Sequence, residues 1–273
     1  MKTRLIMNSI RIGITDCARY SNYERWFLDA PVKVDIIRLS YRLNNLNDIE
    51  QCQGVVLSGG EDVDPRRYKR PDLLGRVEFT DIDEKRDDFE MEVIHRSLQL
   101  KLPILSICRG MQLFNVYHGG TLVYDIPTVT KISGHAKVQG IDQRHEIIVR
   151  EKTLLKEITG CIKGAVNSSH HQCVEKLGAE LTVAAIAEEP IIEAIQWKNA
   201  KENPFYLGVQ WHPERMVDQT SPFSFNIRQA FLDYITKDED SFVSIINEEE
   251  SSVHQNEIEN QPPLSSSQIV DKQ

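Results

Sequence analysis

Short apolar runs alternate with amphipathic segments along the first half of the chain. Apolar runs predict strands over Arg11–Thr15, Gly54–Leu57 and Ile104–Ile107, and alternating apolar positions predict another over Val32–Leu39. A nearly continuous run such as Ile104–Ile107 is typical of a strand buried on both faces. Between these runs, apolar residues at helical spacing predict helices over Leu46–Cys52 and Asp83–Leu100. Strands that alternate with helices in this way form a mostly parallel sheet flanked by helices, so the pattern predicts the α/β class.

The second half of the chain has a different pattern. Strand-like runs follow one another with short turns between them, over His145–Val149, Leu181–Ala187, Ile191–Trp197 and Phe205–Val209. Because such turns leave little room for crossover helices, additional antiparallel strands are expected beside the parallel sheet. A last helix is predicted over Ser221–Thr236, with Ser221 as a cap and Pro222 in the first turn.

Composition and charge separate a folded body from a tail. Residues 1–237 carry 31 Lys and Arg against 32 Asp and Glu, whereas residues 238–273 carry nine acidic residues and one lysine, a net charge of −8. The nearly neutral body gives no basis for binding nucleic acid or an anionic membrane. The tail has too few apolar residues to fold alone and is expected to be disordered. We therefore predict one domain over 1–237 and an acidic tail over 238–273.

Cysteine usage and the lengths of the apolar runs predict a cytoplasmic protein. The five cysteines form an odd number with no CxxC spacing, which argues against a disulfide framework or a zinc knuckle. The longest apolar runs are too short to cross a bilayer, and the first residues lack the apolar core of a signal peptide.

One cysteine stands at a position suited to catalysis. Cys108 lies between the predicted strand Ile104–Ile107 and the segment Arg109–Tyr117, whose apolar residues recur at helical spacing. A thiol at a helix N-terminus is near unpaired N–H groups and the positive end of the helix dipole, which favour the nucleophilic thiolate. Gly110 allows a tight turn and a close approach. The alternative is a buried core cysteine, the commoner role of a free thiol.

Two further motifs contain groups that could act with such a thiol. Gly59 and Gly60 follow the strand Gly54–Leu57, where a double glycine can either expose backbone N–H groups to a ligand or form an ordinary turn. In the motif GVQWHPER, His212 is a candidate general base and Glu214 a candidate orienting acid, because alternation along an extended chain would place both on one side. A solvated surface turn is the alternative for this motif.

The motif VNSSHHQ holds two adjacent histidines, His170 and His171. On a strand they would face opposite ways and could not easily share one metal ion, so a polar pocket wall is favoured over a metal site. His118, His135 and His145 are interpreted as structural or surface residues.

Four motifs in one order carry a family resemblance, namely VVLSGGEDVDP, CRGMQLFNVYHGGTL, VNSSHHQ and GVQWHPE. Together they resemble the class I glutamine amidotransferase-like superfamily over roughly residues 10–236, and within it the C26 group of gamma-glutamyl hydrolases. The resemblance implies a flavodoxin-like α/β fold. It also implies hydrolysis, through a cysteine thioester, of the gamma-glutamyl amide bond in small compounds such as gamma-glutamyl-gamma-aminobutyrate.

The resemblance assigns roles to individual residues. Cys108 matches the nucleophile, His212 the base and Glu214 the acid of a catalytic triad. The backbone N–H groups of Gly60 and Arg109 match an oxyanion hole. Residues that hold the substrate are implied at Gln112, Ser168, His171 and Gln172.

No metal or organic cofactor is expected from the resemblance, because backbone donors polarise the carbonyl and the nucleophile belongs to the chain. The expected partner is a small-molecule gamma-glutamyl substrate. Binding to nucleic acid or to a membrane is not expected, and formation of a homo-oligomer is left open. A glutaminase subunit that supplies ammonia to a synthetase and a non-catalytic ligand-sensing protein are the two alternatives. The segment Tyr20–Leu39 lacks the glycine-containing turn usual in the family, so the leaving-group side of the pocket is expected to differ.

Overall fold

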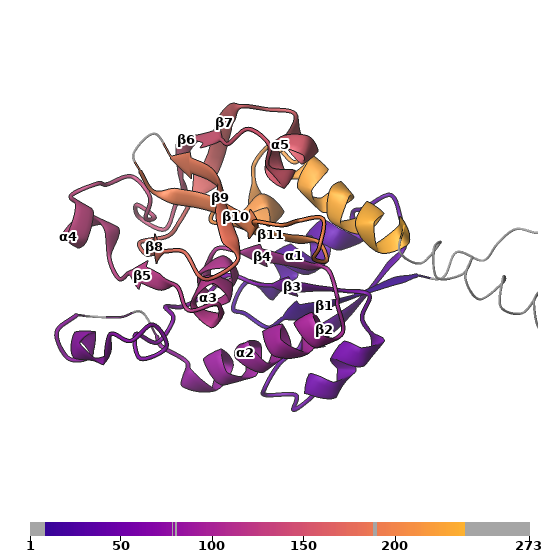
Figure 1. Ribbon diagram of the computed structural model, residues 1–273, viewed down its shortest axis with the longest axis horizontal. Coiled ribbons are helices and arrows are strands. Elements are labelled where there is room, and N and C mark those ends of the chain that lie inside the picture. The colour runs from indigo at the N-terminus through magenta and orange to yellow at the C-terminus, as the bar shows by residue number, and fades with distance from the viewer. Residues whose placement is uncertain (1–8, 78, 80, 188–189, 238–273) are drawn as a thin grey trace, which may run out of the picture. The chain divides into compact units, whose positions relative to one another are not determined.

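A computed structural model describes residues 9–77, 79, 81–187 and 190–237 (Figure 1). The described residues up to Ile235 belong to one compact unit, and Thr236 begins a second. The predicted disorder of the tail over 238–273 lies outside the described residues. Within the described ranges, no helix has the length and apolar character needed to cross a membrane.

The main sheet has nine strands in the order β2-β1-β3-β4-β11-β10-β9-β6-β7. Strands β2, β1, β3, β4 and β11 run parallel, and the pairs from β11 to β7 are antiparallel. A separate antiparallel pair is formed by β5 and β8. The predicted α/β class, a parallel sheet with additional antiparallel strands, is confirmed. The strands are β1 Ile10–Thr15, β2 Val34–Leu39, β3 Gly54–Leu57, β4 Ile104–Ile107, β5 Thr121–Val123, β6 Gln143–Val149, β7 Lys163–Ser168, β8 Cys173–Lys176, β9 Leu181–Ala187, β10 Ile192–Trp197 and β11 Tyr206–Val209.

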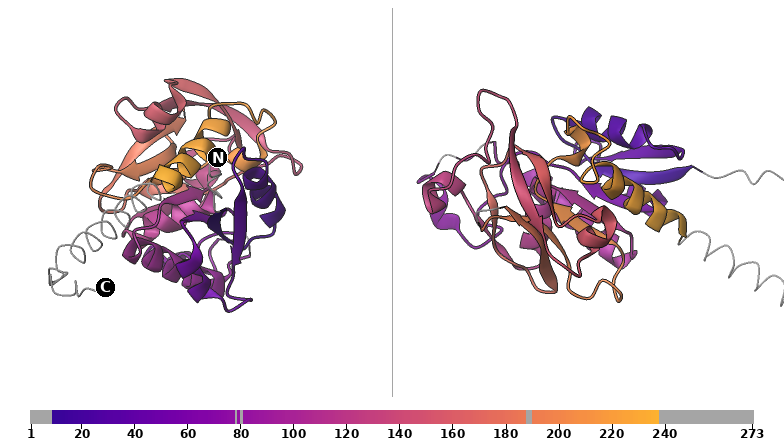
Figure 2. Two further views of the ribbon diagram at one scale, coloured as in Figure 1. Left: turned by 90° about the vertical axis from the view of Figure 1, so that its right-hand side faces the viewer. Right: turned by 90° about the horizontal axis from the view of Figure 1, so that it is seen from above.

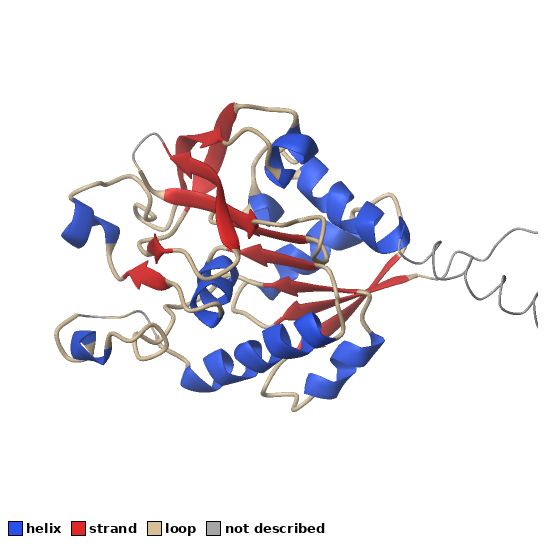
Figure 3. Cartoon of the chain, viewed as in Figure 1, coloured by secondary structure: helices blue, strands red, loops and turns tan. Residues whose placement is uncertain are grey.

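Helices cover both faces of the parallel strands, which Figure 3 shows in blue and red. The last helix, over residues 225–237, lies on one side of the sheet and α2 on the other (Figure 1). The helices are α1 Tyr20–Leu28, α2 Glu84–Gln99, α3 Arg109–Tyr117, α4 Ile126–Thr130 and α5 Leu154–Thr159, and the 3-10 turns are η1 Leu46–Gln51, η2 Pro71–Leu73 and η3 Pro213–Arg215.

The two faces of the sheet form two separate cores. On β4, Leu105 and Ile107 pack in the core that includes α1 and the last helix, whereas Ile104 packs in the core that includes α2 and α3. Successive side chains of a strand point to opposite faces, so a strand between two cores needs a continuous apolar run. In the first core, the rings of Phe27 on α1 and Phe231 on the last helix meet at a centroid distance of 6.0 Å. Figure 2 shows α1 in indigo and the last helix in yellow in two further views.

The structure differs from the sequence prediction at several elements, and β5, β7, β8, α4 and α5 were not predicted. Helix α1 is not among the predicted helices, although four aromatic residues at helical spacing fill its buried face. The last helix begins at residue 225 instead of Ser221, because residues 221–224 form turns in which the Ser221 hydroxyl accepts the N–H of Phe223 at 3.3 Å. Strand β11, expected in the antiparallel group, pairs parallel with β4 as well as antiparallel with β10.

Candidate active site

Cys108 joins β4 to α3 through a strained backbone conformation. Its φ of 53° and ψ of −110° lie in a region that residues with side chains rarely adopt. Two hydrogen bonds hold this conformation, since the Cys108 N–H donates to Val209 O at 2.7 Å and the Cys108 carbonyl accepts the N–H of Gln112 at 3.2 Å. At Gly110, an added Cβ would lie 2.3 Å from the carbonyl oxygen of Leu57, so glycine is required for α3 to approach β3. The structure therefore forms the predicted elbow.

The parallel pairing of β11 with β4 brings His212 to the cysteine. Val209 lies opposite Ile107, so the chain that leaves β11 passes beside the elbow. His212 is only 5% exposed, and it lines the same cavity as Cys108. Its Nδ1 lies 2.9 Å from Glu214 Oε1. The structure thus brings together the three residues predicted as a triad.

The electrostatic environment of His212 favours its protonated form. Burial lowers the pKa of the imidazole, but the neighbouring Glu214 carboxylate and the Cys108 sulfur outweigh burial and raise this pKa to about 9. A protonated imidazole beside a sulfur stabilises the thiolate, and it can also give its proton to a leaving group. The arrangement can therefore supply a nucleophile and a general acid at neutral pH.

Glu214 reaches the imidazole by a different local geometry than predicted. The expectation of an extended chain through residues 212–214 is wrong, because Pro213–Arg215 forms the 3-10 turn η3. Proline suits the first position of such a turn, and the turn places Glu214 where its carboxylate accepts the imidazole N–H. Arg215 Nε lies 3.8 Å from the same carboxylate oxygen.

The backbone N–H groups predicted for the oxyanion hole lie on two sides of Cys108. The Gly59 N–H already donates to the Tyr23 hydroxyl at 2.8 Å, which favours Gly60 over Gly59 as the donor. An added Cβ at Gly60 would lie 2.1 Å from the Arg86 guanidinium, so a side chain there would displace Arg86 from its present position. Arg109 is the first residue of α3, where backbone N–H groups lack an intrahelical acceptor.

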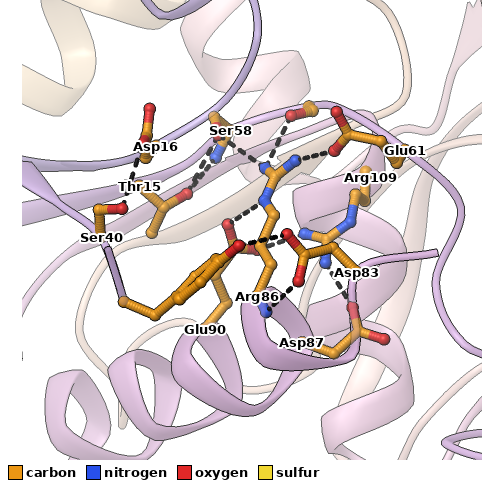
Figure 4. A network of polar contacts seen from close by, with 12 residues as sticks. Thr15, Asp16, Ser40, Ser58, Glu61, Asp83, Arg86, Asp87, Glu90 and Arg109 are labelled. Carbon is orange, nitrogen blue, oxygen red and sulfur yellow. Dashed lines mark hydrogen bonds and ion pairs between the residues drawn. The ribbon is translucent and has the colours of Figure 1, made fainter. Parts of the chain in front are cut away.

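A buried network of ion pairs holds both donor segments (Figure 4). Arg86 on α2 donates to the Gly59 carbonyl at 2.9 Å and to Glu90 Oε1 at 2.8 Å. Glu90 also pairs with the guanidinium of Arg109, which reaches Asp87 as well. The Arg109 side chain is 2% exposed and points into this network. Its side chain is therefore structural, while its backbone N–H is the group predicted to face the substrate.

Cys108, His212 and Glu214 line one cavity of about 260 Å³. Gly59 and Gly60 line the same cavity, together with Cys17, Ala18, Arg19, Tyr23, Glu61, Asp81, Lys137, Ser169 and Arg215. Burial and the positive charges of Arg215 and Arg19 lower the pKa of Lys137. Three cationic groups thus gather at this cavity, which suits an anionic group on a ligand. Sequence reasoning missed Arg19 and Lys137, because neither lies in a motif.

The four residues predicted to hold substrate have protein partners in the structure. The described part of the cavity lining includes none of them. Gln112 Nε2 donates to Gln172 O at 3.0 Å. Gln172 Nε2 donates at 3.3 Å to the backbone carbonyl of Tyr124, the residue after β5. The Ser168 hydroxyl donates to the carbonyl of His135 at 2.6 Å. Contacts of these residues with a substrate stay a prediction.

His171, the fourth of these residues, lies between two carboxylates. Its Nε2 lies 2.8 Å from Asp62 Oδ1 and its Nδ1 lies 3.2 Å from Asp125 Oδ1, and the hydrogen bond to Asp62 is the main cause that raises its pKa to about 9. The adjacent His170 turns the other way, toward Glu193. The two histidines therefore face different partners, although they lie between β7 and β8 and not on a strand as predicted.

Gln210 is a site residue that sequence reasoning missed. Its Nε2 donates to Cys108 Sγ at 3.6 Å, and its Oε1 accepts from Gln112 Nε2 at 3.1 Å. The signal was available, because Gln210 lies within the motif GVQWHPE two residues before His212. Gln112 thus acts on the cysteine through Gln210 in this structure.

Known proteins are similar to this chain in sequence or in fold. A family model described as Peptidase C26 matches residues 38–214. The chain is 34% identical over 229 residues to a gamma-glutamyl-gamma-aminobutyrate hydrolase of Escherichia coli O157:H7, covering 77% of this chain and 87% of that protein. It is 33% identical over 224 residues to a Rickettsia prowazekii protein named for its likeness to glutamine amidotransferases, covering 67% of this chain and 78% of that protein. A crystal structure of a glutamine amidotransferase from Thermotoga maritima shares the fold, with a TM-score of 0.54 at 14% identity, covering 85% of this chain and 86% of that one.

Proposed function

The chain belongs to the Peptidase C26 family, and from this premise we propose that it is a cysteine-dependent hydrolase of small gamma-glutamyl amides. Family membership and the hydrolase relative support a hydrolase or amidotransferase-like activity. The single observation that carries the proposal is Cys108 on a strained elbow, paired with a His212–Glu214 couple in one cavity. Gamma-glutamyl-gamma-aminobutyrate, the compound named for the Escherichia coli relative, is the first candidate substrate.

The proposed reaction has two steps. The Cys108 thiolate attacks the gamma-carbonyl carbon, and the N–H groups of Gly60 and Arg109 stabilise the oxyanion, for which loss of one donor typically costs about 100-fold or more in rate. The C–N bond breaks as the His212 imidazolium gives its proton to the departing amine, which leaves a thioester on Cys108. His212 then takes a proton from water, and the hydroxide attacks the thioester to release glutamate and the free thiol.

The charges around the cavity support a glutamyl group as the acyl part of the substrate. Arg19 and Lys137 line the cavity and suit the alpha-carboxylate of that group, while Glu61 and Asp81 line the same cavity and suit its alpha-ammonium. A cavity of about 260 Å³ has room for a small amino-acid amide and little more. We therefore expect the amine released to be small.

A substrate screen without any added partner protein tests the proposal. Glutamate release would be measured from gamma-glutamyl-gamma-aminobutyrate, from related gamma-glutamyl amides and from free glutamine, with the Cys108→Ala variant as the blank. We expect turnover of the gamma-glutamyl amides by the wild-type chain and none by the variant. Hydrolysis of glutamine alone, or of none of the compounds, would favour a glutaminase that acts with a synthetase. The relative named for its likeness to glutamine amidotransferases supports this alternative.

Covalent labelling separates an enzyme from a ligand-sensing protein on the same fold. A glutamine-like electrophile should label Cys108 at neutral pH, because only an activated thiol reacts readily there. Cys161, which is partly exposed, provides the matched control. Labelling should persist in Cys161→Ala and be lost in Cys108→Ala, and the opposite pattern would refute an activated Cys108.

A further inference from the structure

A second polar cluster lies among the antiparallel strands, outside the lining of the catalytic cavity. His145 belongs to β6 and Glu193 to β10, His170 follows β7, and His135 lies between α4 and β6. Glu193 is fully buried, and His135 and His170 are each 3% exposed. Four segments that are distant in sequence thus place three imidazoles around one buried carboxylate.

Three imidazole nitrogens of this cluster lie near one carboxylate oxygen. Glu193 Oε1 lies 3.1 Å from His145 Nε2, 3.4 Å from His135 Nδ1 and 3.4 Å from His170 Nε2. Ligand atoms about 2.0–2.1 Å from a tetrahedral ion lie roughly 3.3 Å from one another. The ligand atoms of His135, His145 and Glu193 all lie within 4.8 Å of one another, whereas His170 is outside this group.

The facing atoms do not form hydrogen bonds with each other. His135 Nδ1, His145 Nε2, His170 Nε2 and both Glu193 oxygens are buried without a hydrogen-bond partner among the described residues. A buried polar atom left in this way destabilises the folded protein. Four side chains with this deficit gather around one carboxylate, which indicates that a group absent from the chain itself completes the cluster.

The tautomer of His170 indicates the charge of that group. His170 Nδ1 lies 2.9 Å from the backbone carbonyl of Gln172, which can only accept, so Nδ1 carries the proton. In neutral His170 the Nε2 lone pair then faces the Glu193 carboxylate, which is repulsive unless a cation lies between them.

We propose that His135, His145 and Glu193 bind one divalent transition-metal ion, that Zn²⁺ fits this site best, and that His170 supports the Glu193 carboxylate beside it. Two imidazole nitrogens and one carboxylate oxygen form a ligand set typical of Zn²⁺, whereas Ca²⁺ and Mg²⁺ prefer oxygen ligands. The cluster lies outside the lining of the catalytic cavity, so the ion is structural and takes no part in the bond cleavage.

The ion stabilises the residues that position Gln210 beside Cys108. The Gln172 carbonyl that accepts from His170 also accepts from Gln112 Nε2, and Gln112 contacts Gln210, which donates to Cys108 Sγ. The Gln210 N–H donates to the Glu193 carbonyl at 2.7 Å. Metal binding therefore orders two of the segments that position Gln210.

Metal retention by the untagged full chain tests this proposal. Chelator-treated protein would be mixed with Zn²⁺, passed through a desalting column, and assayed for metal by elemental mass spectrometry. We expect about one Zn²⁺ per chain in the wild type. Glu193→Gln and His145→Gln should lower the affinity by more than about 100-fold, because even a residue that only supports a ligand typically contributes about 10- to 100-fold.

Two variants serve as controls. His95→Gln removes an exposed imidazole on α2 and should retain the metal. Cys108→Ala should also retain it, which excludes binding at the catalytic thiol. Because a cluster variant could fail to fold, the wild-type chain would also be loaded with Co²⁺ and examined for the intense visible bands of a tetrahedral site without thiolate ligands.

Each outcome decides for or against the site. Retention by wild type, His95→Gln and Cys108→Ala, with loss in Glu193→Gln, supports it. Absence of Zn²⁺ retention and of the Co²⁺ bands in the wild type would overturn it, as would retention that is lost only in Cys108→Ala. None of these measurements uses substrate turnover, so a failure of the metal-site proposal can be distinguished from a failure of the proposed hydrolase activity.

Discussion

The Glu214→Gln variant tests the electrostatic part of the site most directly. Glu214 and Cys108 together raise the pKa of His212 from its ordinary 6.5 to about 9 against the opposing effect of burial. That rise corresponds to about 3 kcal/mol of preferential stabilisation of the imidazolium. Glutamine keeps the size of the side chain and removes its charge. With the main raising influence gone and burial unchanged, we expect the His212 pKa to fall to 6.5 or below.

The pKa can be followed by nuclear magnetic resonance on protein with ¹⁵N-labelled histidine. The signals of His212 would be identified as those absent from a His212→Gln variant. At pH 7.5 the imidazolium fraction should fall from nearly all to about a tenth in Glu214→Gln, and labelling of Cys108 by iodoacetamide should slow by about tenfold. An unchanged His212 titration in Glu214→Gln would refute the assignment of Glu214 as the group that sets this pKa.

The same pKa has a consequence for stability. Because the folded-state pKa of His212 is raised, its contribution to stability is fully present below pH 6.5 and is lost as the pH rises through about 9. Urea denaturation across this range should therefore show a smaller pH-dependent loss of stability in Glu214→Gln than in the wild type. An equal loss in both proteins would show that the His212–Glu214 pair does not contribute.

Two further substitutions test how the elbow is built. Gly110→Ala should destabilise the protein by about 1–3 kcal/mol in urea denaturation, because the new Cβ would clash with the Leu57 carbonyl. Helix propensity alone predicts the opposite, a gain in stability of about 1 kcal/mol. A measured gain would refute the close approach of α3 to β3. Arg109→Ala should cost about 3–5 kcal/mol in the same assay, because it leaves the buried carboxylates of Asp87 and Glu90 without their shared partner. A loss below 1 kcal/mol would show that Arg109 matters only through its backbone.

The sequence by itself determined the elements that lie between the two cores. The predicted bounds of β3, β4 and α3 agree with the structure, because a strand buried on both faces needs a continuous apolar run and the helix after it shows a clear period. The position of Cys108 between strand and helix follows from the same pattern. Helix α1 also had a readable signal in its spaced aromatic residues.

Only the tertiary structure decided which groups meet around Cys108. The parallel pairing of β11 with β4 brings His212 to the elbow, and local periodicity cannot specify which strands become neighbours. Lys137 reaches the cavity from a loop that no motif marks. The gathering of three histidines around Glu193 likewise depends on strand order, since its members lie on separate segments with no common spacing. Chemistry that depends on residues distant in sequence is set by strand order and register, which the pattern of a single chain does not contain.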